Sequence, residues 1–125
     1  MSYVIRYVKP SYILQDTILS DTFIPREQDN NGISVWSLEY YLRINQEDPI
    51  GELRRNHGDY NFSASGKLIL IDITCLERNG LRVIPNPSKN NPAHTRIETF
   101  PTDEVELYEL IDNIFNCVED YYPAV

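Results

Sequence analysis

The chain has 125 residues, of which 42% are hydrophobic and 11% aromatic, and its formal net charge is −8. This length suits one hydrophobic core and is short for two ordinary domains, and the apolar content excludes wholesale disorder. The longest apolar run, Leu68–Ile71, has four residues, whereas a membrane-spanning helix needs roughly 20. The N-terminus has no secretory pattern. We therefore expect a protein without a membrane role.

The negative charge is concentrated at the C-terminal end. Residues 103–125 contain seven acids and no Lys or Arg, and the preceding residues hold the other 12 acids and all 11 bases. General nucleic-acid binding through a basic face is therefore disfavoured, although the nearly neutral part of the chain can make local contacts.

The two cysteines, Cys75 and Cys117, are too few and too far apart for a disulfide framework or a zinc knuckle. They are predicted to be buried free thiols in a reducing cytoplasm. The sequence predicts no cofactor and no metal site.

Local patterns in the first half of the chain predict two strands and two helical turns. Tyr3–Val8 and Ile33–Trp36 have the β-branched and aromatic character of strands, and the second follows an Asn-Gly turn signal. Ser37 could cap a helix through "LEYYLRI", or that segment could extend the strand. Asp48 and the proline after it have the pattern of a helix start. Ser11–Leu19 fits a short helix or an irregular turn.

The second half begins with the clearest strand, Lys67–Ile73, whose continuous apolar character predicts a central position in a sheet. Asp72 can cap the helical turn "ITCLER", which Asn79-Gly80 would end. Two further strands are predicted at Leu81–Ile84 and His94–Phe100. Residues 102–122 carry apolar side chains at spacings of three and four, which predicts one amphipathic helix. Asp103 and Glu106 at its start have capping-box spacing.

These elements predict an α+β fold over residues 1–125, as one domain. A mostly antiparallel sheet of four to five strands, within residues 3–100, would pack against a C-terminal amphipathic helix that spans residues 102–122.

His94 is the best single candidate for chemistry. The segment "NPAHTRI" delivers it from a proline loop to the start of a strand, which suits a general base or a phosphate contact. The alternative is a surface or hydrogen-bonded histidine at a strand edge. Arg6 is unusual because it lies between Val4 and Val8 on one strand face. It could pair with Glu98 in a site or extend from an exposed edge.

Two other groups of residues are weaker candidates for binding. Arg54, Arg55 and His57 could hold an anion, although a solvated helix end explains them equally well. The acidic C-terminal segment could bind a basic protein partner, and its candidate contacts are Glu106, Glu109 and Asp112. A solvated outer face would produce the same charge pattern.

The chain also resembles a family of small uncharacterised bacterial proteins. The resemblance lies in Phe23–Val35, which follows the pattern F-x-P…D-x-x-G-[IL]-S-V, and in "NPAHTRI", which follows N-P-A-H-x-x-I. It implies that Arg6, the Gly32–Ser34 turn and His94 belong to one site. The long acidic helix has no counterpart in the family pattern.

Two hypotheses of function follow. The leading one is a small cytoplasmic bacterial protein that binds another macromolecule, as an accessory or antitoxin-like factor, with a homodimer also allowed. The alternative is a nucleotide-, NAD- or RNA-processing enzyme or binding module that uses His94 and Arg6, with Glu98 as a further candidate and Ser34 as a binding residue.

Overall fold

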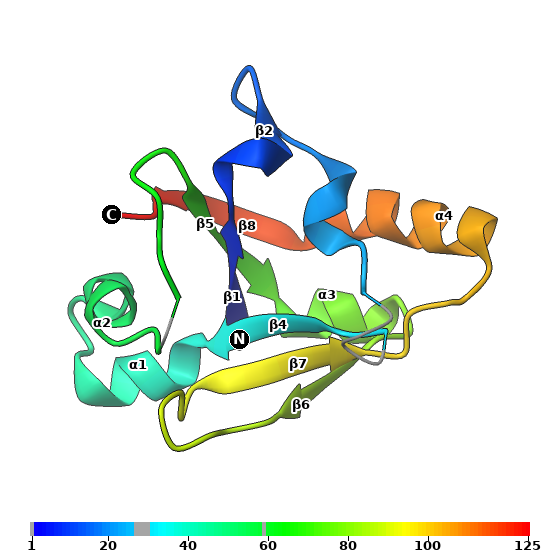
Figure 1. Ribbon diagram of the computed structural model, residues 1–125. Helices are drawn as coiled ribbons and strands as arrows, with labels where there is room; N and C mark the ends of the chain where they lie inside the picture. The colour runs from blue at the N-terminus through cyan, green and yellow to red at the C-terminus, as the bar shows by residue number, and fades with distance from the viewer. Residues whose placement is uncertain (1, 27–30, 59) are drawn as a thin grey trace.

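We analysed a computed structural model of the protein, which describes residues 2–26, 31–58 and 60–125. Its strands are β1 (Tyr3–Val8), β2 (Ile13–Leu14), β3 (Thr17–Ile18), β4 (Ile33–Ser37), β5 (Lys67–Asp72), β6 (Arg82–Pro85), β7 (His94–Glu98) and β8 (Val118–Pro123). Six of them form one antiparallel sheet in the order β6-β7-β4-β1-β5-β8 (Figure 1), and β2 and β3 form a separate hairpin.

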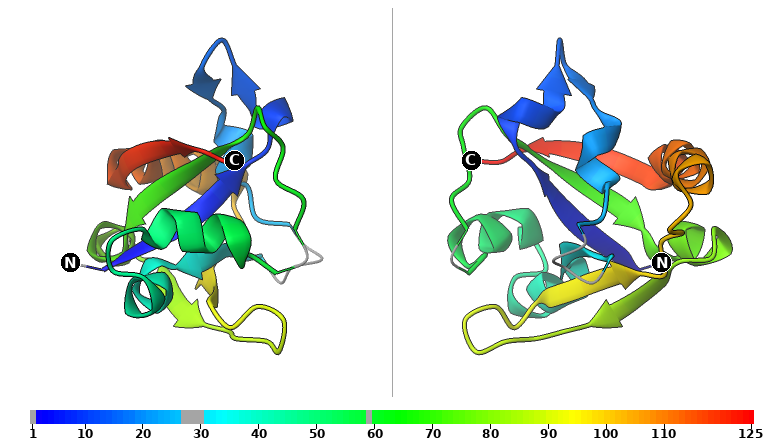
Figure 2. Two further views of the ribbon diagram at one scale, coloured as in Figure 1. Left: turned by 90° about the vertical axis from the view of Figure 1, so that its left-hand side faces the viewer. Right: turned by 45° about the vertical axis from the view of Figure 1, so that its right-hand side comes forward.

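The helices are short. They are α1 (Leu38–Ile44), α2 (Pro49–Arg55), α3 (Ile73–Arg78) and α4 (Glu104–Ile114), with 3-10 turns η1 (Pro10–Tyr12), η2 (Ser20–Phe23) and η4 (Phe115–Cys117). Figure 2 shows α1 and α2 side by side, with α4 at the far end of the molecule. No helix among the described residues is long and apolar enough to cross a bilayer.

The predicted helix starts are confirmed by their capping hydrogen bonds. The Asp48 carboxylate accepts the Gly51 N–H at 3.0 Å, and the Asp72 carboxylate accepts the Thr74 N–H at 3.0 Å. Ser37 caps α1 and Asp103 caps α4 in the same manner, each through the N–H three residues on. These caps satisfy backbone donors that have no partner inside the helix, so each start is determined locally.

The antiparallel α+β character is confirmed, but the expected count of four to five strands is wrong because the sheet has six. The additional strand lies in the predicted C-terminal helix. Residues 102–122 do not form one helix: α4 ends at Ile114, and Val118–Pro123 instead pairs with β5. Val, Tyr and Tyr suit a strand, and β5 would otherwise leave a row of backbone groups unpaired. Pairing with β5 therefore decides the structure of this segment, in spite of its helical spacing of apolar residues.

The expected packing of the C-terminal helix on the sheet is not confirmed. The elements closest to α4 are η2 and η4, rather than a strand. Ile111 and Ile114 are nevertheless fully buried in the hydrophobic core.

Residues 11–19, where a short helix or an irregular turn was expected, form η1 followed by the β2-β3 hairpin. The hairpin turns at Gln15 and Asp16, which have φ angles of 49° and 65°. Two successive left-handed residues give a turn whose twist matches that of the flanking strands. Residues 27–30, just before the Asn-Gly turn signal, lie outside the described residues.

The prediction of two free thiols is wrong. Cys75 of α3 and Cys117 of η4 form a disulfide, and their Cα atoms are 5.4 Å apart. The sequence separation of 42 residues argued against pairing, but the fold brings α3 and η4 together. The expectation of a cytoplasmic location loses the support that free thiols would have given it.

The sheet has a hydrophobic cluster on each face, because successive strand residues point to opposite sides. One cluster contains Val4, Ile69 and Ile71 together with buried residues of η2, α3 and α4. The other contains Ile5 and Leu68 together with buried residues of α1 and α2.

The strands β1 and β4 separate soon after they meet. β1 pairs with β5 along all six of its residues, but with β4 only at Val4↔Ser37 and Ile5↔Trp36. Beyond that point the two strands run in different directions (Figure 1). Later residues of β1 therefore border a gap between two neighbouring strands of the same sheet.

Candidate ligand-binding site

A cavity of about 270 Å³ occupies the gap between β1 and β4. This volume is near the lower end of the range for small-molecule sites, roughly 300–1,000 Å³. The cavity is lined from four parts of the chain: β1 with η1, the η2 region, β4, and the segment that contains Tyr60.

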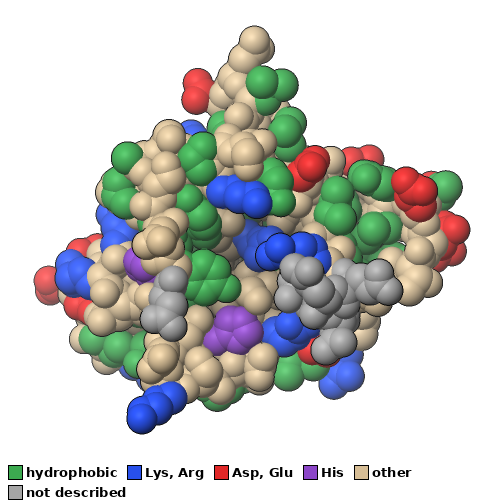
Figure 3. All heavy atoms as spheres, in the orientation of Figure 1, with side chains coloured by type: hydrophobic (Ala, Val, Ile, Leu, Met, Phe, Trp, Pro, Cys, Tyr) green, Lys and Arg blue, Asp and Glu red, His purple; other side chains and the backbone are tan. Residues whose placement is uncertain are grey.

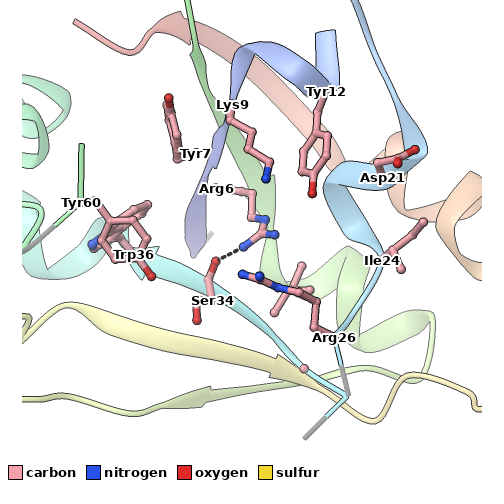
Figure 4. Close-up of a pocket in the computed structure, with 12 residues that line it drawn as sticks. Arg6, Tyr7, Lys9, Tyr12, Asp21, Ile24, Arg26, Ser34, Trp36 and Tyr60 are labelled. Atoms are coloured by element: carbon pink, nitrogen blue, oxygen red, sulfur yellow. Dashed lines mark hydrogen bonds between the residues drawn. The ribbon is translucent and has the colours of Figure 1, made fainter. Parts of the chain in front are cut away.

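Arg6 reaches from β1 across the gap to β4 (Figure 4). Its Nη1 donates to the Ser34 carbonyl at 2.6 Å, and its Nε donates to the Thr22 carbonyl at 3.1 Å. The two carbonyls come from β4 and η2, so one guanidinium connects three elements. A strand arginine flanked by valines is therefore explained by the separation of the strands, because it spans the space that a neighbouring strand would otherwise occupy.

Two further basic side chains, Lys9 and Arg26, line the same cavity. The Lys9 ammonium lies 4.5 Å from the centre of the Tyr12 ring, within the range of a cation–π contact. Among the described residues, Lys9 forms no ion pair with a carboxylate. Asp21 is the acidic residue in the described lining.

The opposite side of the cavity is aromatic. In Figure 4, Tyr7, Trp36 and Tyr60 lie on one side of Arg6, and Lys9 and Tyr12 lie on the other. The Trp36 and Tyr60 rings meet edge to face, with centroids 5.0 Å apart. Trp36 is also held by the hydrogen bond from its Nε1 to the carbonyl of His57, at 3.2 Å. The wall is thus a preformed apolar surface.

Ser34 joins the predicted residues into one cluster. Its carbonyl accepts from Arg6, and its hydroxyl lies 3.0 Å from His94 Nε2. The other ring nitrogen of His94, Nδ1, lies 2.8 Å from the carbonyl of Asn86. The structure therefore brings Arg6, Ser34 and His94 together through Ser34.

Glu98 does not line the cavity. Its carboxylate pairs with Arg96, with 3.2 Å between Oε1 and Nε. Arg96 pairs in register with Ser34 on β4, and its guanidinium passes close to Gly32. Any effect of Glu98 on the cluster acts through Arg96.

Arg54, Arg55 and His57 each make a different contact. Arg54 donates to the carbonyl of Pro123 at 2.6 Å, and Arg55 pairs with Glu52 at 2.8 Å. The His57 ring stacks on Phe62, with centroids 4.0 Å apart, and burial lowers its pKa. A lowered pKa favours the uncharged imidazole, which is a poor anion ligand.

Glu106, Glu109 and Asp112 are exposed on α4, away from the residues that line the cavity. Figure 3 shows acidic side chains gathered over the α4 end of the molecule, and basic side chains near the centre of the same face. The net charge of −8 therefore conceals a basic region on an acidic protein.

Sequence reasoning missed Lys9, Tyr12, Arg26, Trp36 and Tyr60 as members of the site. Arg26 stands beside the Asn-Gly turn that was already singled out, which is the one local signal that could have pointed to it. The others come together only because η1 and the Tyr60 segment fold over the gap.

No group of three or more His, Cys, Asp and Glu side chains is placed to hold a metal ion among the described residues. No family model, curated protein or solved structure matches the chain. The resemblance to a family of small bacterial proteins therefore stays a prediction, and the case for function stands on the geometry of the cavity.

Proposed function

We propose that this protein binds a phosphate-bearing small ligand, of the nucleotide class, in the cavity between β1 and β4. The observation that carries the proposal is the convergence of Arg6, Lys9 and Arg26 on one cavity in an acidic protein. Guanidinium and ammonium groups are the side chains that bind phosphate oxygens most strongly.

The aromatic wall supports a nucleotide over a bare phosphate. Bases stack on Tyr and Trp rings, and such stacking contributes roughly 1–3 kcal/mol per base. Tyr7 and Tyr60 offer ring surface at one end of the cavity, where the buried Trp36 packs against Tyr60, and Lys9 lies at the other end. A ligand with one flat apolar end and one anionic end matches both walls.

The test is a calorimetric titration with adenosine 5′-monophosphate, NAD, a short RNA and uncharged adenosine. We expect at least one phosphate-bearing ligand to bind more tightly than adenosine, and Lys9→Gln to weaken that binding about tenfold or more. A hydrogen bond to a charged group contributes about 1.5–3 kcal/mol.

Lys89→Gln is the matched control, because Lys89 is an exposed lysine in the β6–β7 loop and does not line the cavity. Equal binding of adenosine and its phosphates would refute the proposal. So would equal losses in the two lysine variants.

A second candidate function is the binding of a basic protein through α4, as an accessory or antitoxin-like factor. It is favoured by Val105 and Tyr108, which are 67% and 43% exposed and lie among the carboxylates. Apolar anchors surrounded by charge are common at protein interfaces. Neutralising Glu106, Glu109 and Asp112 to their amides should release such a partner in a pull-down, and an unchanged set of captured proteins would count against it.

A further inference from the structure

We propose that Ser34 is a nucleophile activated by His94, so that the cavity cleaves a P–O bond of the phosphate ester it binds. The substrate class rests on the proposed function, whereas the activation of Ser34 rests on its own geometry. Nucleophilic serines are recognised by a base within hydrogen-bond reach and by a third group that orients the base. The structure contains all three parts.

The hydrogen bonds of His94 determine which ring nitrogen carries the proton. The Asn86 carbonyl can only accept, so Nδ1 of His94, at 2.8 Å, must be the donor. In the neutral ring, Nε2 is then an acceptor. The Ser34 hydroxyl, at 3.0 Å, must donate to it. Ser34 thus points its proton at a free imidazole lone pair, which is the arrangement that general-base catalysis requires.

Ser34, His94 and the Asn86 carbonyl also follow one another in the order of a nucleophile, its base and the group that orients the base. Ser34 lines the cavity, whereas His94 does not and lies on β7, the neighbouring strand. The Asn86 carbonyl, before β7, contacts the far side of the imidazole. A ligand in the cavity would meet Ser34, whose hydroxyl is turned toward the histidine.

The basic side chains of the cavity can stabilise the negative charge that develops on the phosphoryl group in the proposed reaction. Arg6 contacts the carbonyl of Ser34 itself at 2.6 Å, and the Arg26 side chain extends toward Arg6 and Ser34 (Figure 4). A phosphoryl group attacked by Ser34 gathers negative charge on its equatorial oxygens, and preorganised cations stabilise that charge. Arg6 therefore fixes the backbone that carries the nucleophile.

The reaction balances in two steps. In the first, Ser34 Oγ bonds to phosphorus, its proton passes to His94 Nε2, and the ester P–O bond breaks; the leaving oxygen takes the proton from His94. In the second, water gives a proton to His94 and bonds to phosphorus, the bond between Ser34 Oγ and phosphorus breaks, and Oγ takes the proton back from His94 as the phosphate leaves. Water is the only co-reactant.

The experiment labels the full-length protein with an alkyl fluorophosphonate, a phosphorus electrophile that loses fluoride when an activated serine attacks. Intact mass gives the rate of labelling, and peptide mass mapping gives the site. We expect a single label at Ser34, formed roughly 100-fold or more slowly in His94→Gln, since general-base catalysis contributes about 10²–10⁴-fold.

Ser88→Ala is the matched control, because Ser88 is an exposed serine in the loop that precedes β7. It should label as the unmodified protein does, whereas Ser34→Ala should not label. Mapping the label on the unmodified protein keeps the test valid even if a site variant fails to fold.

The outcomes separate the two proposals. Nucleotide binding without Ser34 labelling at any pH would overturn the nucleophile and leave the binding function. Labelling at Ser34 in a protein that binds no phosphate ligand would support the nucleophile and overturn the proposed function. Equal labelling rates in His94→Gln and the unmodified protein would show that the Ser34–His94 contact is structural only.

Discussion

Gly32 illustrates how a single residue determines the geometry of the cluster. A Cβ at this position would overlap the guanidinium of Arg96 and would lie 3.0 Å from the carbonyl oxygen of Ile97. Arg96 is paired in register with Ser34. The absence of a side chain at Gly32 therefore allows β4 and β7 to carry a large cation and the Ser34–His94 pair at adjacent positions.

We predict that Gly32→Ala destabilises the protein by about 1–2 kcal/mol, the usual cost of overpacking a close contact. Urea unfolding measures this change. The same variant should weaken ligand binding, because Arg96 must move beside Ser34. If both stability and affinity are unchanged in this variant, the Arg96 side chain moves away from the added methyl group without a cost in free energy.

His57 predicts a pH dependence of stability. Burial lowers its pKa in the folded protein, and its Nδ1 is buried without a hydrogen-bond partner among the described residues. The unfolded chain therefore binds the proton more readily at pH values below about 6.5, the ordinary pKa of histidine. The contribution of His57 to stability is complete above that pH and declines as the pH falls.

His57→Phe should reduce this decline, because phenylalanine keeps the ring that stacks on Phe62 and carries no titrating group. The measurement compares the free energies of unfolding of the two proteins at pH 7.5 and pH 5.5. An identical loss of stability in both would assign the acid sensitivity to other groups.

At the scale of elements, the disulfide determines how the C-terminal region is held. It links α3 to η4, directly after α4 ends and before β8 begins. The helix therefore stops where the chain must turn to reach the edge of β5. The N-caps of α1, α2, α3 and α4 could be predicted from the sequence because each is a contact within three residues.

We predict that the double variant Cys75→Ser and Cys117→Ser loses about 4 kcal/mol of stability, as the chain-entropy account gives for a loop of this length. Its far-UV spectrum at low temperature should stay close to that of the oxidised protein. Titration with a thiol reagent under denaturing conditions checks the bond directly. Two reactive thiols in the purified, unreduced protein would contradict the disulfide.

At the scale of the whole molecule, the strand order predicts which backbone amides are best protected from hydrogen exchange. β1 is hydrogen-bonded to strands on both sides at its start and to β5 along its full length, and β5 is paired on both sides. β6 and β8 are the two edges of the sheet. Opening of a central strand requires more of the core to be exposed.

Amide hydrogen exchange should therefore be slowest in β1 and β5 and faster in β6 and β8. The β1 amides beyond Ile5 that donate to β5 should exchange more slowly than edge amides even though they border the cavity, because the pairing with β5 continues. Rapid exchange throughout Val118–Pro123 would agree with an edge strand. Protection of that segment equal to that of β1 would contradict the strand order.

The sequence by itself determined the local structure: strands at Tyr3–Val8 and Lys67–Asp72, the turn at Asn79-Gly80, and the helix starts at Asp48, Asp72 and Asp103. These depend on neighbours within a few residues. The pattern also pointed to Arg6 and His94, since each stood out from its own segment, whereas Ser34 was named only through the family resemblance. Only the tertiary structure decided β8, the disulfide and the cavity. Each of these depends on segments brought together across the fold: the unpaired edge of β5, the meeting of α3 with η4, and the separation of β1 from β4.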